Sequence, residues 1–114
     1  MRFFGLKTCD TCRKALKELS EAGHAPAVID VRADGVPQAD LAQIIARFGA
    51  GAINRSSATW RGLDEGARAA DPAALIAAHP TLLKRPVVTD GDVWTQGWGP
   101  EARAHWLGKG AGAA

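Results

Sequence analysis

Two cysteines near the start of the chain are the residues with the clearest chemical potential. Cys9 and Cys12 lie between an apolar stretch at residues 2–6 and a helical pattern at residues 11–22. A thiol at such a junction lies beside unpaired backbone N–H groups and the positive end of the helix dipole, both of which favour the thiolate. Because the thiolate is the nucleophilic form, Cys9 is predicted to be a catalytic nucleophile.

The role of Cys12 has two interpretations that the sequence leaves open. Its position, three residues after Cys9, allows it to resolve a sulfenate or a mixed disulfide on Cys9. Equally, it fits a spectator packed under the helix, since free cysteine is often buried. A zinc site is not expected, because structural zinc takes four ligands and the three histidines show no ligand spacing to the cysteines.

Composition narrows the class of protein. The chain has 114 residues, of which 46% are hydrophobic and 23% charged, with a net charge of +2. This suits one globular domain; the dispersed Lys and Arg residues do not indicate nucleic-acid binding, and no apolar run approaches a membrane span. Two cysteines three positions apart cannot form the disulfide bonds between distant segments that a secreted scaffold needs. A cytoplasmic protein is expected, without membrane or nucleic-acid partners, and as a monomer.

The order of predicted elements defines the fold class. Residues 2–6 and 27–31 are predicted strands flanking the helix at residues 11–22, and together they have the usual length of a βαβ unit. Helices follow, and then a hairpin turning at Asp90-Gly91 and a last helix that opens at Pro100 and runs to about Leu107. With the two-cysteine spacing at the first strand–helix junction, this order predicts an α/β thioredoxin-like fold. The single domain is expected to span residues 1–108, with a flexible tail at residues 109–114.

One backbone feature is also predicted. Pro86 stands at the start of the third strand, where its missing N–H is tolerated. The Arg85–Pro86 peptide bond is predicted to be cis, and Pro86 is expected to shape the floor beneath Cys9.

Three segments resemble signature blocks of a known family. They are residues 9–15, 54–61 and 79–86, and they resemble those of the arsenate reductase-like ArsC/Spx family in order and approximate spacing. The short length and the Cys-Asp-Thr start look closest to the YffB-like branch. The resemblance implies a thioredoxin-like fold with a helical insertion between its βαβ and ββα halves, at about residues 38–78.

The resemblance also implies roles for individual residues. The family's nucleophilic cysteine matches Cys9, and arginines matching Arg55 and Arg85 hold the oxyanion in arsenate reductases, where glutathione and a glutaredoxin resolve the arsenic adduct. Forked guanidinium donors suit a tetrahedral oxyanion and also favour a nearby thiolate. The implied function is a cytosolic, arsenate reductase-like thiol oxidoreductase with no bound cofactor and with glutathione as a co-substrate.

Two further candidates lie beside the cysteines. Arg13 is expected either to assist the thiolate or to solvate the helix, and Thr11 either to donate a hydrogen bond to the thiolate or to cap the helix. One feature departs from the family: arsenate reductases carry a third arginine about a dozen residues beyond the Arg-Pro pair, whereas residues 87–102 contain no Lys or Arg. The anion site is therefore expected to be incomplete.

An alternative function follows from the same resemblance. Spx-type regulators bind RNA polymerase and use two cysteines at this spacing as a disulfide switch, which matches Cys9 and Cys12. Their C-terminal segments tend to be longer and more charged than the one here. The enzyme is therefore preferred.

Overall fold

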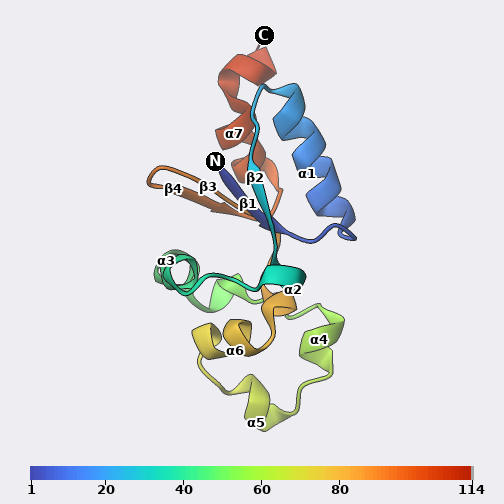
Figure 1. Cartoon of the computed structure of the whole chain (residues 1–114), viewed down its shortest axis with the longest axis vertical. Helices are drawn as coiled ribbons and strands as arrows, with labels where there is room; N and C mark the ends of the chain where they lie inside the picture. The colour runs from blue at the N-terminus through green and yellow to red at the C-terminus, as the bar shows by residue number, and fades with distance from the viewer. Residues whose placement is uncertain (114) are drawn as a thin grey trace. The chain divides into compact units, whose positions relative to one another are not determined.

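A four-stranded sheet is the centre of the first of two structural units. The computed structural model describes the backbone of residues 1–113 and the side chains of residues 1–107. The first unit consists of residues 1–30 together with residues 85 onward, and residues 31–84 form the second. Figure 1 labels the elements of both units.

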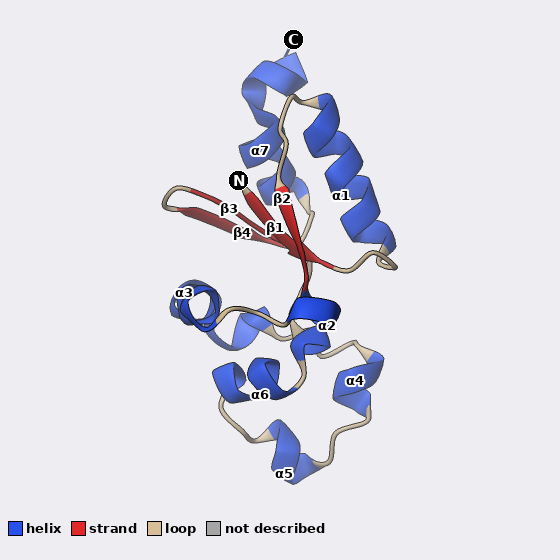
Figure 2. Ribbon diagram, in the orientation of Figure 1, coloured by secondary structure: helices blue, strands red, loops and turns tan. Residues whose placement is uncertain are grey.

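The sheet has the strand order β2-β1-β3-β4. Its strands are β1 (Arg2–Gly5), β2 (Ala27–Asp30), β3 (Val87–Asp90) and β4 (Val93–Gln96). β1 and β2 are parallel and are joined by α1 (Asp10–Glu21), whereas β3 runs antiparallel to both β1 and β4 (Figure 2). Both the predicted βαβ unit and the predicted hairpin are thereby confirmed.

One face of this sheet is covered by α1 and by the last helix, α7 (Pro100–Ala113). Phe3 and Val88 are paired across β1 and β3 and are fully buried. They pack with Leu19 of α1 and Trp106 of α7. Because side chains alternate along a strand, Phe3 and Val88 are both directed to this face of the sheet.

The second unit is helical. Its elements are α2 (Val31–Asp34), α3 (Gln38–Phe48), the 3-10 turn η1 (Gly49–Ala52), α4 (Ala58–Arg61), α5 (Glu65–Arg68), α6 (Pro72–Ala78) and the 3-10 turn η2 (Pro80–Leu82). Leu41 and Ile44 of α3 are buried, as are Leu75 and Ile76 of α6. Asp71 caps α6 as the sequence predicts, accepting the N–H groups of residues 73 and 74.

The α/β thioredoxin-like element order is confirmed. Residues 1–108 divide into two compact units, and that they act as one domain stays a prediction. The helical unit covers residues 31–84 rather than 38–78, because α2 and η2 also belong to it. α7 continues to Ala113, so residues 109–113 of the predicted tail are helical; that the tail is flexible stays a prediction, and Ala114 lies outside the described residues. No described helix has both the length and the apolar character to cross a bilayer.

Candidate thiol site

Cys9 occupies the N-cap position of α1. Its backbone is extended (φ −85°, ψ 118°), and its carbonyl oxygen accepts the Arg13 N–H at 3.0 Å. The side chain makes no capping hydrogen bond and is half-buried, and the thiol is free. The thiol therefore lies where the peptide dipoles of the first turn favour negative charge, as the sequence predicts.

Cys12 lies on the inner side of the same helical turn. It is 1% exposed and packs in the cluster that contains Phe3. Burial raises the pKa of the Cys12 thiol from 9.0 to about 12, and a contact with the Cys9 thiol acts in the same direction. A hydrogen bond from the Leu6 backbone and the charge of Arg85 lower the pKa by less. Cys12 is thus a neutral thiol at physiological pH.

Gly5 makes room for the Cys12 sulfur. A Cβ atom added at Gly5 would lie 2.8 Å from Cys12 Sγ and 2.7 Å from Cε1 of Phe3. Both of these neighbours are buried side chains that have little space to move. The end of β1 therefore admits only glycine without displacement of the core beneath α1.

The two charged residues of the first turn pair with each other. Arg13 donates to a carboxylate oxygen of Asp10, three residues earlier. Both side chains are exposed, so this pair adds little stability. It does offset the negative charge of Asp10 next to Cys9, and it directs the Arg13 guanidinium toward Asp10.

The other predicted neighbours of Cys9 have different surroundings. The Thr11 side chain is exposed and, within the described residues, makes no hydrogen bond to protein, so the capping role was wrong: Cys9 holds the cap position. Arg85 is half-buried, and its charge acts on the Cys12 thiol. Pro86 is buried, its peptide bond with Arg85 is cis as predicted, and its carbonyl oxygen accepts the Gly97 N–H at 2.8 Å.

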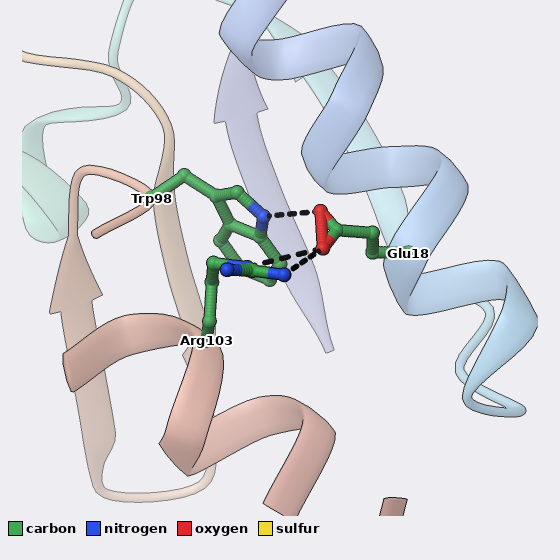
Figure 3. A network of polar contacts seen from close by, with 3 residues as sticks. All are labelled: Glu18, Trp98 and Arg103. Carbon is green, nitrogen blue, oxygen red and sulfur yellow. Dashed lines mark hydrogen bonds and ion pairs between the residues drawn. The ribbon is translucent and has the colours of Figure 1, made fainter. Parts of the chain in front are cut away.

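A polar network attaches α1 to the C-terminal segment. Glu18 accepts the Trp98 indole N–H at 2.9 Å and two N–H groups of Arg103 at 2.7 and 3.0 Å (Figure 3). These donors, Trp98 first, lower the pKa of Glu18. Arg103 is the first basic residue after Arg85. Because it is committed to Glu18, it does not supply the third arginine of the family's anion site.

Arg55 belongs to the second unit, in a tightly bonded loop before α4. The Ser57 hydroxyl accepts the Trp60 N–H at 3.1 Å and donates to the Asn54 carbonyl oxygen at 2.8 Å. Arg61 donates to the Ser56 carbonyl oxygen at 2.8 Å. Arg55 itself is exposed, with its Cζ 5.5 Å from the centroid of the Trp60 ring.

Outside the surroundings of the cysteines, the described residues form a hollow in the helical unit and show no metal-ligand cluster. A hollow of about 430 Å³ between α3 and α6 is lined by one polar and five apolar residues: Gln38, Val36, Leu41, Ala42, Ala73 and Ala77. None of the predicted site residues lies in it. Within the described residues, no three His, Cys, Asp or Glu side chains gather as metal ligands would.

Six predicted site residues thus belong to the first unit: Cys9, Cys12, Thr11, Arg13, Arg85 and Pro86. That Arg55 acts on the same ligand as Cys9 stays a prediction. Sequence reasoning missed Gly5 and Glu18, which fix the position of α1, and also Arg68, which contacts Trp60. None of these carries a local signal, since each acts through partners chosen by the tertiary fold.

Comparison with known proteins identifies the family of this chain. A model of the ArsC family matches residues 4–104. The chain belongs to the ArsC family. A curated relative in Haemophilus influenzae, described as an uncharacterized protein, is 37% identical over 90 residues, which are 75% of this chain and 79% of the relative.

Solved structures of similar proteins share the fold of this ArsC-family chain. The YffB protein is 34% identical with a TM-score of 0.82, over 92% of this chain and 96% of its own. An arsenate reductase (ArsC) related protein from Brucella melitensis is 27% identical with a TM-score of 0.68, over 94% of this chain and 95% of its own. The fold is thus that of ArsC-like thioredoxin-fold proteins.

Proposed function

We propose that the protein is a cytoplasmic thiol oxidoreductase that reduces glutathione-containing disulfides with Cys9 as the nucleophile. One observation carries the proposal: Cys9 stands at the N-terminus of α1, half-buried, with a free thiol that is not used in capping. Such a position favours the reactive thiolate. Membership of the ArsC family and similarity to an arsenate reductase related protein support a thiol-dependent reductase.

The proposed reaction consists of two thiol–disulfide exchanges. The Cys9 thiolate attacks the glutathione sulfur of a mixed disulfide, so that a bond forms between Cys9 and glutathione and the other thiolate leaves and takes a proton from water. A second glutathione, as its thiolate, then attacks the glutathione sulfur on Cys9 and releases the Cys9 thiolate. One mixed disulfide and one glutathione thus become one free thiol and glutathione disulfide. A glutaredoxin is a second candidate for the resolving thiol.

The surroundings of Cys12 support a mechanism with one catalytic cysteine. To resolve an adduct on Cys9, Cys12 would have to act as a thiolate. Its thiol touches that of Cys9, yet it is buried and has a pKa of about 12. We therefore propose that an external thiol, rather than Cys12, completes the cycle.

The arginines support a carboxylate-bearing substrate over arsenate. Arg55 and Arg85 are the proposed anion-binding residues, and Thr11 and Arg13 are proposed to contribute at the helix start. Arg103, the next arginine in the chain, pairs with Glu18. Two arginines suit the separate single charges of the glutathione carboxylates better than the concentrated charge of arsenate.

Steady-state turnover tests the proposal. The mixed disulfide of glutathione and 2-mercaptoethanol is the substrate, with glutathione as reductant, and arsenate is assayed in parallel. Wild type and Cys12→Ala should turn over the disulfide, whereas Cys9→Ser should not. The proposal fails if wild type does not exceed Cys9→Ser, and the one-cysteine mechanism fails if folded Cys12→Ala is as inactive as Cys9→Ser.

The Spx-type regulator is the second candidate function. It would use a Cys9–Cys12 disulfide as its switch, and the contact between the two thiols suits that bond. The burial of Cys12 limits its oxidation, because susceptibility follows thiolate character and exposure.

A further inference from the structure

Trp60 contacts two arginines in the second unit. Its ring centroid is 5.5 Å from Cζ of Arg55 and 5.5 Å from Cζ of Arg68. An aromatic ring attracts a guanidinium through its quadrupole. A guanidinium stacked on a ring keeps its N–H groups in its own plane, where they remain available. The ring therefore restrains an arginine without using its hydrogen-bond donors.

The two arginines use their donors differently. Arg68 donates to the carbonyl oxygens of Trp60 and Arg61, each at 3.3 Å. These carbonyls belong to the last residues of α4, so Arg68 binds the C-terminal end of this helix; the Trp60 carbonyl oxygen also accepts the Leu63 N–H at 3.1 Å. Among the described residues, Arg55 donates no hydrogen bond to protein and pairs with no carboxylate. The donors of Arg68 are committed to the fold, whereas those of Arg55 are available to a ligand.

Trp60 is itself held in place from several directions. Its N–H donates to the Ser57 hydroxyl and its carbonyl oxygen accepts from Arg68. The residue before it, Thr59, is hydrogen-bonded to Thr81 of the following segment at 2.9 Å. The backbone that carries the indole platform is thus held in place, and the side chain is half-buried.

We propose that Trp60 and Arg68 are positioning residues that hold the Arg55 guanidinium ready for an anionic group of the substrate. The inference rests on the proposed function for the nature of that group, a glutathione carboxylate. Arg68 acts through Trp60: it binds the end of α4, and its guanidinium contacts the same ring that supports Arg55. Loss of the ring leaves Arg55 present but mobile, which weakens anion binding about threefold.

Nuclear magnetic resonance of the arginine side chains tests the positioning directly. The ¹⁵N heteronuclear NOE of the Arg55 Nε–H is measured in wild type, Trp60→Leu, Trp60→Phe and Arg68→Gln. The NOE should fall in Trp60→Leu and in Arg68→Gln, and Trp60→Phe, which keeps an aromatic face, should retain it. An unchanged NOE in both Trp60→Leu and Arg68→Gln overturns the proposal.

Kinetics with the glutathione–2-mercaptoethanol disulfide supply the second measurement. Trp60→Leu should raise KM about threefold with kcat unchanged, and it should have no further effect in an Arg55→Gln background. An equal rise of KM in that background means that Trp60 acts by another route and refutes the proposal. If wild type turns over no disulfide, the proposed function fails while the NOE still decides whether the platform holds Arg55. If Trp60→Leu does not fold, Arg68→Gln decides.

Discussion

Cys12 is predicted to resist alkylation in the folded protein far more than an ordinary thiol does. Its pKa is raised by three units, from 9.0 to about 12, and each unit lowers the thiolate fraction at neutral pH tenfold. Ionisation alone therefore slows the reaction by up to about a thousandfold. Burial, the largest cause of the raised pKa, remains when Cys9 is replaced, whereas the contribution of the Cys9 thiol does not. Removing Cys9 in a Cys9→Ser variant isolates Cys12, because the chain has only two cysteines.

The assay compares the iodoacetamide reaction of Cys9→Ser in the native and the denatured state, followed by mass spectrometry. Native Cys12 should react at least about a hundredfold more slowly. Cys12→Ala, which retains Cys9, is the control and should be modified readily while folded. A native rate within tenfold of the denatured rate would refute the conclusion that Cys12 is a neutral, enclosed thiol.

The same shift has a consequence for stability at alkaline pH. The folded state holds the Cys12 proton more tightly than the unfolded state does, so the stabilisation is fully present below pH 9.0 and is lost as pH rises toward about 12. Across that window the free energy of unfolding should fall by up to about 1.4 kcal/mol per pH unit from this group. Urea denaturation of wild type and Cys12→Ala at several pH values measures how the free energy of unfolding of each protein depends on pH. The same pH dependence in both proteins would contradict this prediction.

Three further predictions concern stability, each measured by denaturant unfolding. Gly5→Ala should lower the free energy of unfolding by about 2 kcal/mol, because the added methyl group overpacks against Phe3 and Cys12. The control is Gly51→Ala, which has no atom within 4 Å of the added Cβ and should change the free energy of unfolding little. Equal effects of the two substitutions would contradict this prediction. Because the pKa of Glu18 is lowered, its contribution to stability is present above pH 4.5 and is lost at lower pH. Glu18→Gln should therefore lose less of its free energy of unfolding between neutral and acid pH than wild type does. The same pH dependence in both proteins would count against the network. Asp71→Ala should cost about 1 kcal/mol through loss of the α6 cap, and a neutral result would show that the cap adds nothing.

Local patterns predicted most of the elements because their signals are short-range. The Asp90-Gly91 turn, the cap and proline at the start of α6, and the helix after Cys9 all depend on neighbours in sequence. The extent of α7 was missed because the final residues combine alanine, a strong helix former, with glycine, a poor one. Composition alone does not decide between helix and tail there.

The candidate site was predicted by residue type but not by environment. Cys9 was placed correctly because a strand–helix junction is a local feature. The burial of Cys12 depends on Phe3 and Trp106, which are far from each other in sequence, so its two interpretations stayed open. Arg68 gave no signal at all, because its role depends on the carbonyl groups that the fold places beside it.

The order of the strands has a consequence during synthesis. β1 lies between β2 and β3, yet β3 follows only after the whole helical unit of residues 31–84. Until Val88 and Trp106 emerge from the ribosome, the growing chain lacks the side chains that enclose Cys12. The nascent protein therefore exposes two neighbouring thiols to oxidants, and it depends most on a reducing environment before the last strand pair has formed.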